Sequence, residues 1–200
     1  MAESPRVLPT TYEDYLAALE ASPVKLEFHG GEIFAMTGGS VVHAHLAGVA
    51  YSVLRSSMAG KPCRMFNSEL RIAVAGDVCF PDASVICGPV QVDWRDRNAV
   101  TNPVVIVEVL SASTEQYDRG GKFELYRRIA SLRDYLLVSQ DPNQIEHFAR
   151  NDDGSWLYRA CVEGDTVHPS GCSGAIAVSE VFADVAELRA LAEAAPATVP

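Results

Sequence analysis

The sequence predicts an α/β (α+β) protein in which helices flank a mixed central β-sheet, and three observations support this. The run 104–110 (VVIVEVL) is apolar except for one glutamate and of strand length, which is typical of a central strand buried on both faces. Apolar residues at helical spacing over 46–54 predict a long helix that packs on the sheet. No internal repeat or linker divides the 200 residues, so we expect a single domain over 1–200.

The first half of the chain predicts two helices, a hairpin and several strands. Thr10 or Thr11 can cap a short helix that ends near residue 20. Segments on either side of Gly30-Gly31 predict a hairpin, and Ser40 then opens the long helix to about residue 58. The hairpin arms are 25–29 and 32–37, the next strands are 63–66, 69–74 and 80–87, and the polar segment 90–102 is a loop or a short helix.

The second half predicts one helix directly after the central strand, over 117–130. Three further segments carry strand signals: 134–139, 144–150 and 156–162. A terminal helix is expected from residue 179, and the Ala/Pro-rich end over 190–200 is expected to fray.

The composition predicts a cytoplasmic protein. No apolar run approaches the roughly 18–20 residues that cross a bilayer. The first residues, MAESPRVLPTTYEDY, lack the basic and apolar stretches of a secretory signal. We expect the five cysteines to be reduced thiols packed as small hydrophobes, rather than a disulfide framework or a zinc site. They are Cys63, Cys79, Cys87, Cys161 and Cys172.

The formal net charge of −10 argues against a nonspecific nucleic-acid coat, because phosphate backbones repel acidic surfaces. Two segments are nevertheless locally basic. Segment 119–133 has five bases and one acid, and segment 55–71 has four bases and one acid. Such runs are usually solvated faces, although they would also suit a polyanionic substrate.

Glu108 does not fit an apolar core, because it stands between valines inside the predicted central strand. A lone carboxylate there costs free energy unless it is paired, hydrogen-bonded or bound to a metal. The functional interpretation is that Glu108 belongs to a functional site. The structural alternative is a satisfied ion pair, or a strand end that reaches solvent.

Asp82 repeats this anomaly in the segment FPDASVIC, although after Pro81 it could merely cap a strand start. Two carboxylates on neighbouring central strands are what a hard divalent cation needs. Mg²⁺ typically takes one or two protein carboxylates and completes its coordination with water and phosphate oxygens.

Lys122 is the third unusual polar residue. It shares one face of the predicted helix with Leu125, Tyr126 and Ile129. Lys122 is therefore the first residue of the apolar face that is expected to point inward. The alternative is a lysine that extends along the helix end to solvent. A position near the helix N-terminus does not favour a role for its charge in the helix dipole.

These residues resemble the PD-(D/E)XK nuclease superfamily, which has the restriction-endonuclease-like fold, and within it a large bacterial branch of uncharacterised proteins. The resemblance covers about 10–182. It depends on LEFHGGEIFAMTGGS with His43 following, on FPDASVICG, and on NPVVIVEVLSASTEQYDRGGKFELYRRIASLRDYLLV.

The resemblance implies that Asp82 and Glu108 bind Mg²⁺ or Mn²⁺, with the carbonyl of Val109 as a further ligand. The superfamily's usual lysine, two residues after the second acid, falls here on Leu110. The branch implies that Lys122 on the following helix replaces it.

Other residues have two interpretations each. Glu27 resembles an additional acid near the metal, or is a strand glutamate paired with Lys25 or an arginine. His43 is packed or faces substrate rather than binding metal, and His45 is a weaker candidate. Tyr126 is a core residue whose hydroxyl could lie near the site, and Asp118 is expected to cap the helix.

We therefore expect a metal-dependent endonuclease that hydrolyses phosphodiester bonds, acting on DNA rather than RNA and working as a homodimer by analogy with nucleases of this fold. Asp82 and Glu108 hold the metal, and Lys122 orients or deprotonates the attacking water and stabilises developing charge. The alternative is a binding or assembly module on a nuclease scaffold with a weak or lost active site. A third possibility is a metallohydrolase of small phosphate esters.

Overall fold

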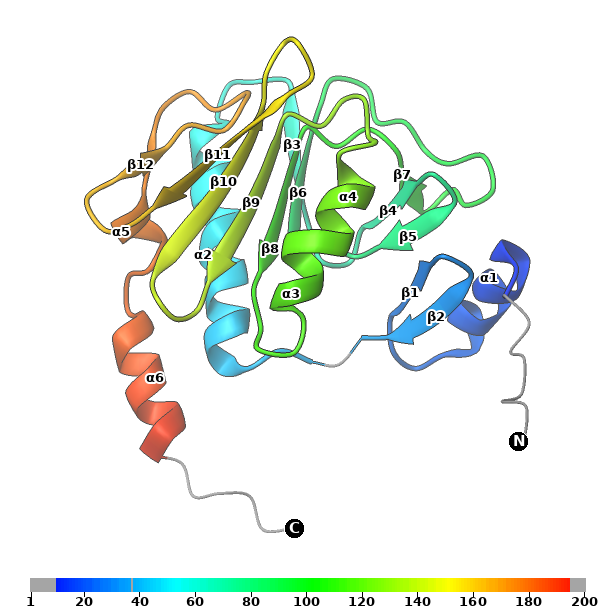
Figure 1. Ribbon diagram of the computed structural model, residues 1–200, viewed down its shortest axis with the longest axis horizontal. Helices are drawn as coiled ribbons and strands as arrows, with labels where there is room; N and C mark the ends of the chain where they lie inside the picture. Colours follow the sequence, from blue (N-terminus) through cyan, green and yellow to red (C-terminus); the bar gives the residue numbers. More distant parts are fainter. Residues whose placement is uncertain (1–9, 37, 195–200) are drawn as a thin grey trace, which may run out of the picture.

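The computed structural model describes residues 10–36 and 38–194. In this part of the chain the strands form a six-stranded mixed sheet, a five-stranded sheet and a two-stranded ribbon, with helices packed around them (Figure 1). The predicted α/β (α+β) class is confirmed.

The six-stranded sheet forms the centre of the molecule. In spatial order its strands are β11 (Trp156–Cys161), β10 (Gln144–Arg150), β9 (Asp134–Ser139), β8 (Val105–Val109), β6 (Ala83–Cys87) and β3 (Cys63–Asn67). β8 and β9 run parallel, whereas the other neighbours are antiparallel. The prediction that the run 104–110 forms a central strand is confirmed.

Different helices cover the two faces of β8. Its valines pack with α2 (Val41–Ser57) in one buried cluster, whereas Ile106 and Leu110 pack with α4 (Phe123–Tyr126) in another. Because side chains alternate along a strand, Glu108 belongs to the α4 face. An acid therefore stands inside an otherwise apolar layer between sheet and helix.

The five-stranded sheet carries the N-terminal hairpin. In order its strands are β2 (Glu32–Ala35), β1 (Leu26–His29), β5 (Asp77–Cys79), β4 (Arg71–Val74) and β7 (Ala99–Val100). α1 (Tyr12–Ala21) begins after Thr11, whose side chain forms a capping box with Asp14. Tyr15 fixes this helix to β1 by donating its hydroxyl to the carbonyl of Leu26. The predicted first helix and hairpin are confirmed, and segment 90–102 contains β7 but no helix.

The helix predicted over 117–130 is interrupted. It consists of α3 (Glu115–Tyr117), a π-helical turn η1 (Asp118–Lys122) and α4. Glycines are poor helix formers, and Gly121 has a second role, because a Cβ atom there would lie 2.3 Å from the Tyr117 ring. Arg119 joins the turn to the sheet through a 2.8 Å ion pair with Glu146. The wider turn changes the direction in which Asp118 and Lys122 point.

The predicted terminal helix is divided. After the ribbon of β12 (Thr166–Val167) and β13 (Ile176–Ala177) come α5 (Val178–Val181) and α6 (Val185–Ala194), separated at Asp184 with a positive φ of 64°. α6 includes part of the segment expected to fray, whereas residues 1–9, Thr37 and 195–200 lie outside the described residues. None of the described helices is long and apolar enough to span a membrane, and the cytoplasmic location stays a prediction.

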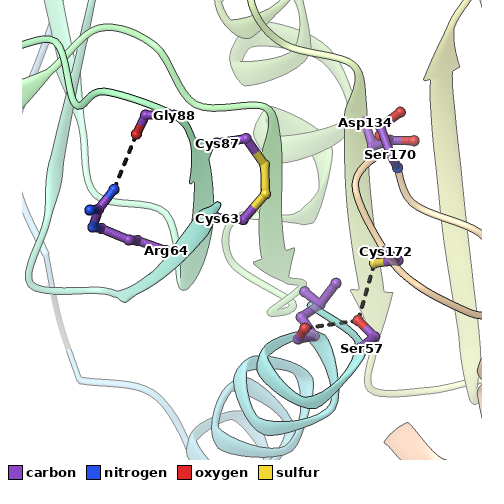
Figure 2. Close-up of a disulfide and its surroundings, with 9 residues drawn as sticks. Ser57, Cys63, Arg64, Cys87, Gly88, Asp134, Ser170 and Cys172 are labelled. Atoms are coloured by element: carbon purple, nitrogen blue, oxygen red, sulfur yellow. Dashed lines mark hydrogen bonds between the residues drawn. A yellow bond between two sulfur atoms is a disulfide. The ribbon is translucent and has the colours of Figure 1, made fainter. Parts of the chain in front are cut away.

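One expectation about the cysteines is wrong, because Cys63 and Cys87 form a disulfide between β3 and β6 (Figure 2). Pro62 accepts a hydrogen bond from the amide of Gly88, so the next pair, Cys63 and Cys87, is a non-hydrogen-bonded pair of the antiparallel ladder. Cα atoms approach most closely in such pairs. Cys79, Cys161 and Cys172 are free, as expected.

Candidate active site

Asp82 and Glu108 meet at one edge of the six-stranded sheet. β6 and β8 pair Ala83 with Val107, so the antiparallel register places Asp82 opposite Glu108. The amide of Val109 donates a 2.7 Å hydrogen bond to Oδ2 of Asp82, which fixes this carboxylate beside the strand. The sequence prediction of two carboxylates on neighbouring strands is thus met by the structure.

Lys122 reaches the same place from η1. Its Nζ lies 3.0 Å from Oε1 of Glu108, 3.3 Å from Oδ1 of Asp118 and 3.7 Å from Oε1 of Glu27. The side chain is buried, which excludes the alternative of a lysine extended to solvent. Leu110, where the superfamily's usual lysine would stand, packs in the core instead.

Electrostatics keep Lys122 charged. Burial alone would lower its pKa, but the carboxylates of Glu108, Glu27 and Asp118 outweigh burial and raise the pKa well above its usual value. Burial acts in the opposite sense on Glu108, whose pKa rises well above the usual range although Lys122 opposes the shift. Tyr126 donates a 2.9 Å hydrogen bond to Oε1 of Glu108, so its hydroxyl lies at the site.

Glu27 approaches Lys122 from β1 of the other sheet. Its Oε1 accepts the amide proton of Phe80 at 2.8 Å, and its Oε2 lies 3.3 Å from Nε2 of His29. Burial would raise the pKa of Glu27, but His29, Lys122 and the Phe80 amide together lower it. The alternative pairing with Lys25 is wrong, because Lys25 bonds Glu69 at 2.7 Å.

The two histidines of α2 point to different places. Ser40 caps the helix by accepting the amide proton of His43, whose ring then lies beside the sheet edge. Nε2 of His43 is 3.5 Å from Oδ2 of Asp82, so His43 faces the acid pair. His45 instead contacts the carbonyl of Ala183 at 3.0 Å, outside the site.

Asp118 is a site residue that the sequence interpretation missed. It does not cap a helix; its side chain is buried beside Lys122, four residues later on the same face. That i,i+4 spacing was the available signal. Oδ1 of Asp118 accepts no hydrogen bond of good geometry, although Lys122 lies within ion-pair distance.

The donor set fits a divalent cation. Glu27, Glu108 and Asp118 surround one ammonium group, and Asp82 stands directly beside Glu108. Burial raises the pKa of Asp82 as well as that of Glu108. Ionising both carboxylates without a bound cation therefore costs free energy. Carboxylate oxygens are the ligands that Mg²⁺ and Mn²⁺ prefer. Asp82 and Glu108 are the pair that could hold such an ion.

A family model described as "Uma2: Putative restriction endonuclease" matches residues 12–177. The chain belongs to this family. The resemblance to the restriction-endonuclease-like nuclease superfamily is therefore confirmed.

The chain is also similar to individual proteins. The uncharacterized protein slr1290 of Synechocystis sp. is 36% identical over 190 residues, covering 92% of this chain and 96% of its own. A second uncharacterized Synechocystis protein, sll1609, is 34% identical over 149 residues, covering 74% of this chain and 84% of its own. A crystal structure described as a "putative nuclease belonging to DUF820" from Anabaena variabilis superposes with a TM-score of 0.72. It covers 88% of this chain and 99% of its own at 17% identity, a likeness that shows the fold.

Proposed function

We propose that this protein is a divalent-metal-dependent endonuclease that hydrolyses phosphodiester bonds of DNA. The observation that carries the proposal is the meeting of Asp82 and Glu108 on adjacent strands, with Lys122 3.0 Å from Glu108. Asp82, Glu108 and the carbonyl of Val109 would hold Mg²⁺ or Mn²⁺. When bound, the ion would supply Lewis-acid chemistry at the scissile phosphate.

Lys122 stabilises the negative charge that develops on the phosphate and orients the attacking water. Since neighbouring acids raise its pKa, it is an ammonium group at neutral pH, which favours charge stabilisation over proton abstraction. Glu27 and Asp118 hold Nζ in position, and Tyr126 orients Glu108. His43, beside Asp82, is placed to contact the substrate. A homodimer with one site for each strand is part of the same proposal, by analogy with nucleases of this fold.

Cleavage assays test the proposal directly. Wild type and Asp82→Ala are incubated with plasmid, single-stranded DNA and RNA in the presence of Mg²⁺ or Mn²⁺. We expect metal-dependent cutting of DNA that falls at least roughly 100-fold in Asp82→Ala, because a group that stabilises transition-state charge typically contributes that much. Equal cutting by both proteins would remove Asp82 from the mechanism, and cutting of RNA alone would correct the substrate class.

A catalytically weak binding module on the same fold is the second candidate, which the net charge of −10 favours. Metal-linked stability separates the two. For the nuclease we expect Mn²⁺ to raise the melting temperature of wild type but not of Asp82→Ala. For the binding module, Mn²⁺ would leave both melting temperatures unchanged.

The Mn²⁺-linked stabilisation should increase with pH. An acid whose pKa is raised by burial keeps its proton to a higher pH, and a metal must displace that proton from Asp82 and Glu108. The melting-temperature shift caused by Mn²⁺ is therefore expected to be smaller at about pH 6 than at about pH 8. Thermal melts with and without metal at both pH values measure it, and a shift that decreases with pH would contradict carboxylate ligation.

A further inference from the structure

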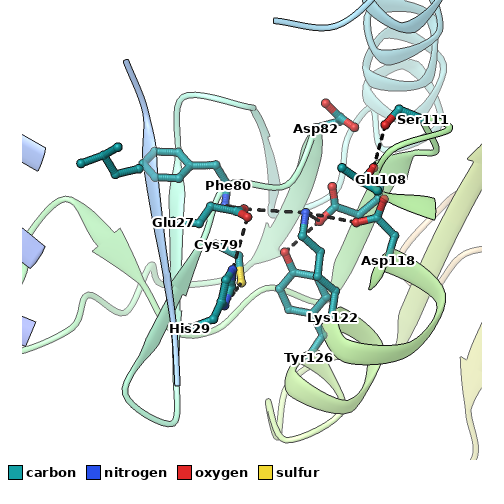
Figure 3. Close-up of polar contacts among 12 residues, drawn as sticks. Glu27, His29, Cys79, Phe80, Asp82, Glu108, Ser111, Asp118, Lys122 and Tyr126 are labelled. Carbon is teal, nitrogen blue, oxygen red and sulfur yellow. Dashed lines mark hydrogen bonds and ion pairs between the residues drawn. The ribbon is translucent and has the colours of Figure 1, made fainter. Parts of the chain in front are cut away.

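Three side chains of the five-stranded sheet gather beside the acid cluster: Glu27, His29 and Cys79. Each offers one donor atom, and these atoms all lie within 4.8 Å of one another. β1 and β5 pair Phe28 with Val78, whose side chains pack with α1. Side chains alternate along a strand, so Glu27, His29 and Cys79 share the opposite face, which is turned toward η1 (Figure 3).

The donor atoms of this group contact one another. Oε2 of Glu27 is 3.3 Å from Nε2 of His29, and Nδ1 of His29 is 3.9 Å from Sγ of Cys79. The other oxygen of Glu27, Oε1, bonds the Phe80 amide and faces Lys122. One carboxylate thus serves two neighbouring sites with different oxygens.

The chemistry of the donors identifies the class of ion. Thiolate, imidazole and carboxylate together suit Zn²⁺ and similar borderline ions rather than Mg²⁺. Zn–S bonds of about 2.3 Å and Zn–N or Zn–O bonds of about 2.0 Å place tetrahedral ligand atoms roughly 3.3–3.6 Å apart. His29 can give only one ring nitrogen to a single ion, and with one donor atom from each residue the three atoms lie within 4.8 Å of one another, so side-chain shifts are needed to reach that range.

We propose that Glu27, His29 and Cys79 form a second metal site, of the zinc type, beside the Asp82–Glu108 pair. Three protein ligands leave one coordination position open, as in catalytic rather than structural zinc sites. Cys79 is fully buried, and a metal there would take the place of the thiol proton.

His29 is the most exposed side chain of the group, at 12%. Its ring lies 5.7 Å from that of Phe34 and 5.5 Å from that of Tyr117, measured between ring centroids. Both of these aromatic residues are exposed. His29 is therefore the member of the group that borders the surface, and a metal entering along this side meets its ring first.

Zinc and cobalt titrations of the full chain test the proposal. After equilibrium dialysis against Zn²⁺ in excess Mg²⁺, we expect one tightly bound equivalent in wild type. Co²⁺ should give a thiolate-to-cobalt charge-transfer band, which only a cysteine ligand produces. Cys79→Ser should lose the band and weaken zinc binding by more than the 10–100-fold typical of losing an outer-sphere partner.

Controls separate this site from others. Cys161→Ser removes a different buried free cysteine and should keep the band. Asp82→Asn should keep zinc binding while losing any Mg²⁺ or Mn²⁺ response, so failure of the nuclease proposal is distinguishable from failure of this one. His29→Gln gives a second test should Cys79→Ser fail to fold, and tight zinc binding by that variant would overturn the proposal.

Two other outcomes would also overturn it. Wild type that binds no zinc would leave Cys79, His29 and Glu27 as a structural hydrogen-bond chain. A band that persists in Cys79→Ser but disappears in Cys172→Ser would assign the metal to a half-buried thiol elsewhere on the chain.

Discussion

Glu108→Gln is expected to abolish metal-dependent DNA cleavage while leaving the chain folded. The amide is nearly isosteric with the carboxylate, and its oxygen can still accept the hydrogen bonds of Tyr126 and Lys122. It cannot supply the negative charge that a hard cation requires. We expect the cleavage rate to fall at least about 1,000-fold, toward the upper end of the loss for removing one electrostatic group.

The stability of Glu108→Gln, unlike its activity, should be retained or increased. Burial raises the pKa of Glu108, so ionising this group in the folded state costs free energy at neutral pH. Removing the charge is therefore expected to leave the melting temperature without metal unchanged or higher, and to remove the Mn²⁺-linked increase. Glu124→Gln, which changes an exposed acid paired with Arg127, is the matched control and should retain activity. A fully active Glu108→Gln protein would contradict the assignment of the site.

The central part of this architecture could be predicted from sequence because its elements are long and strongly patterned. The run 104–110 and the helix after Ser40 were both located within a residue or two. β5 and β7 were not, since strands of two or three residues have no periodicity to detect. The pairing of Cys63 with Cys87 depends on strand register, which pattern alone does not fix.

The residues of the candidate site also divide into those that the sequence identifies and those that it does not. Glu108 and Lys122 were identifiable because each is a charge among apolar neighbours in its own element. Asp118 was not, because an acid near a helix start has an ordinary explanation as a cap. Its burial depends on the π-helical turn that carries it, which the sequence did not predict. Cys79 and His29 come together only because β1 pairs with β5 across 50 residues of chain.

Lys122→Met is expected to lose both activity and stability, which makes it the converse of Glu108→Gln. The variant removes the cation that lies within 4 Å of Glu27, Glu108 and Asp118. Breaking a buried pair by removing one partner typically costs about 3–5 kcal/mol, because the remaining charge is left uncompensated. We expect a loss of that size in urea denaturation without metal at neutral pH.

The pH dependence of this loss has a definite sign. Without Lys122, burial raises the pKa of Glu108 in the folded state with no cation to oppose it, so the destabilising effect of this acid is absent at low pH and grows as pH rises from its ordinary pKa toward the raised one. The deficit of Lys122→Met should therefore shrink on acidification. Lys25→Met, which breaks the partly exposed pair with Glu69, serves as the control and should cost no more than about 1 kcal/mol.

The double variant Lys122→Met/Glu108→Gln tests the structural role of Lys122. Removing the charge of Glu108, which Lys122→Met leaves without its cation, should restore part of the lost stability. Lys122 and Glu108 are in direct contact, so the effects of changing them are not additive. Cleavage should remain absent, since neither the metal ligand nor the charge-stabilising group is present. A double variant that recovers no stability would contradict the idea that Lys122 supports the fold by compensating the charge of Glu108.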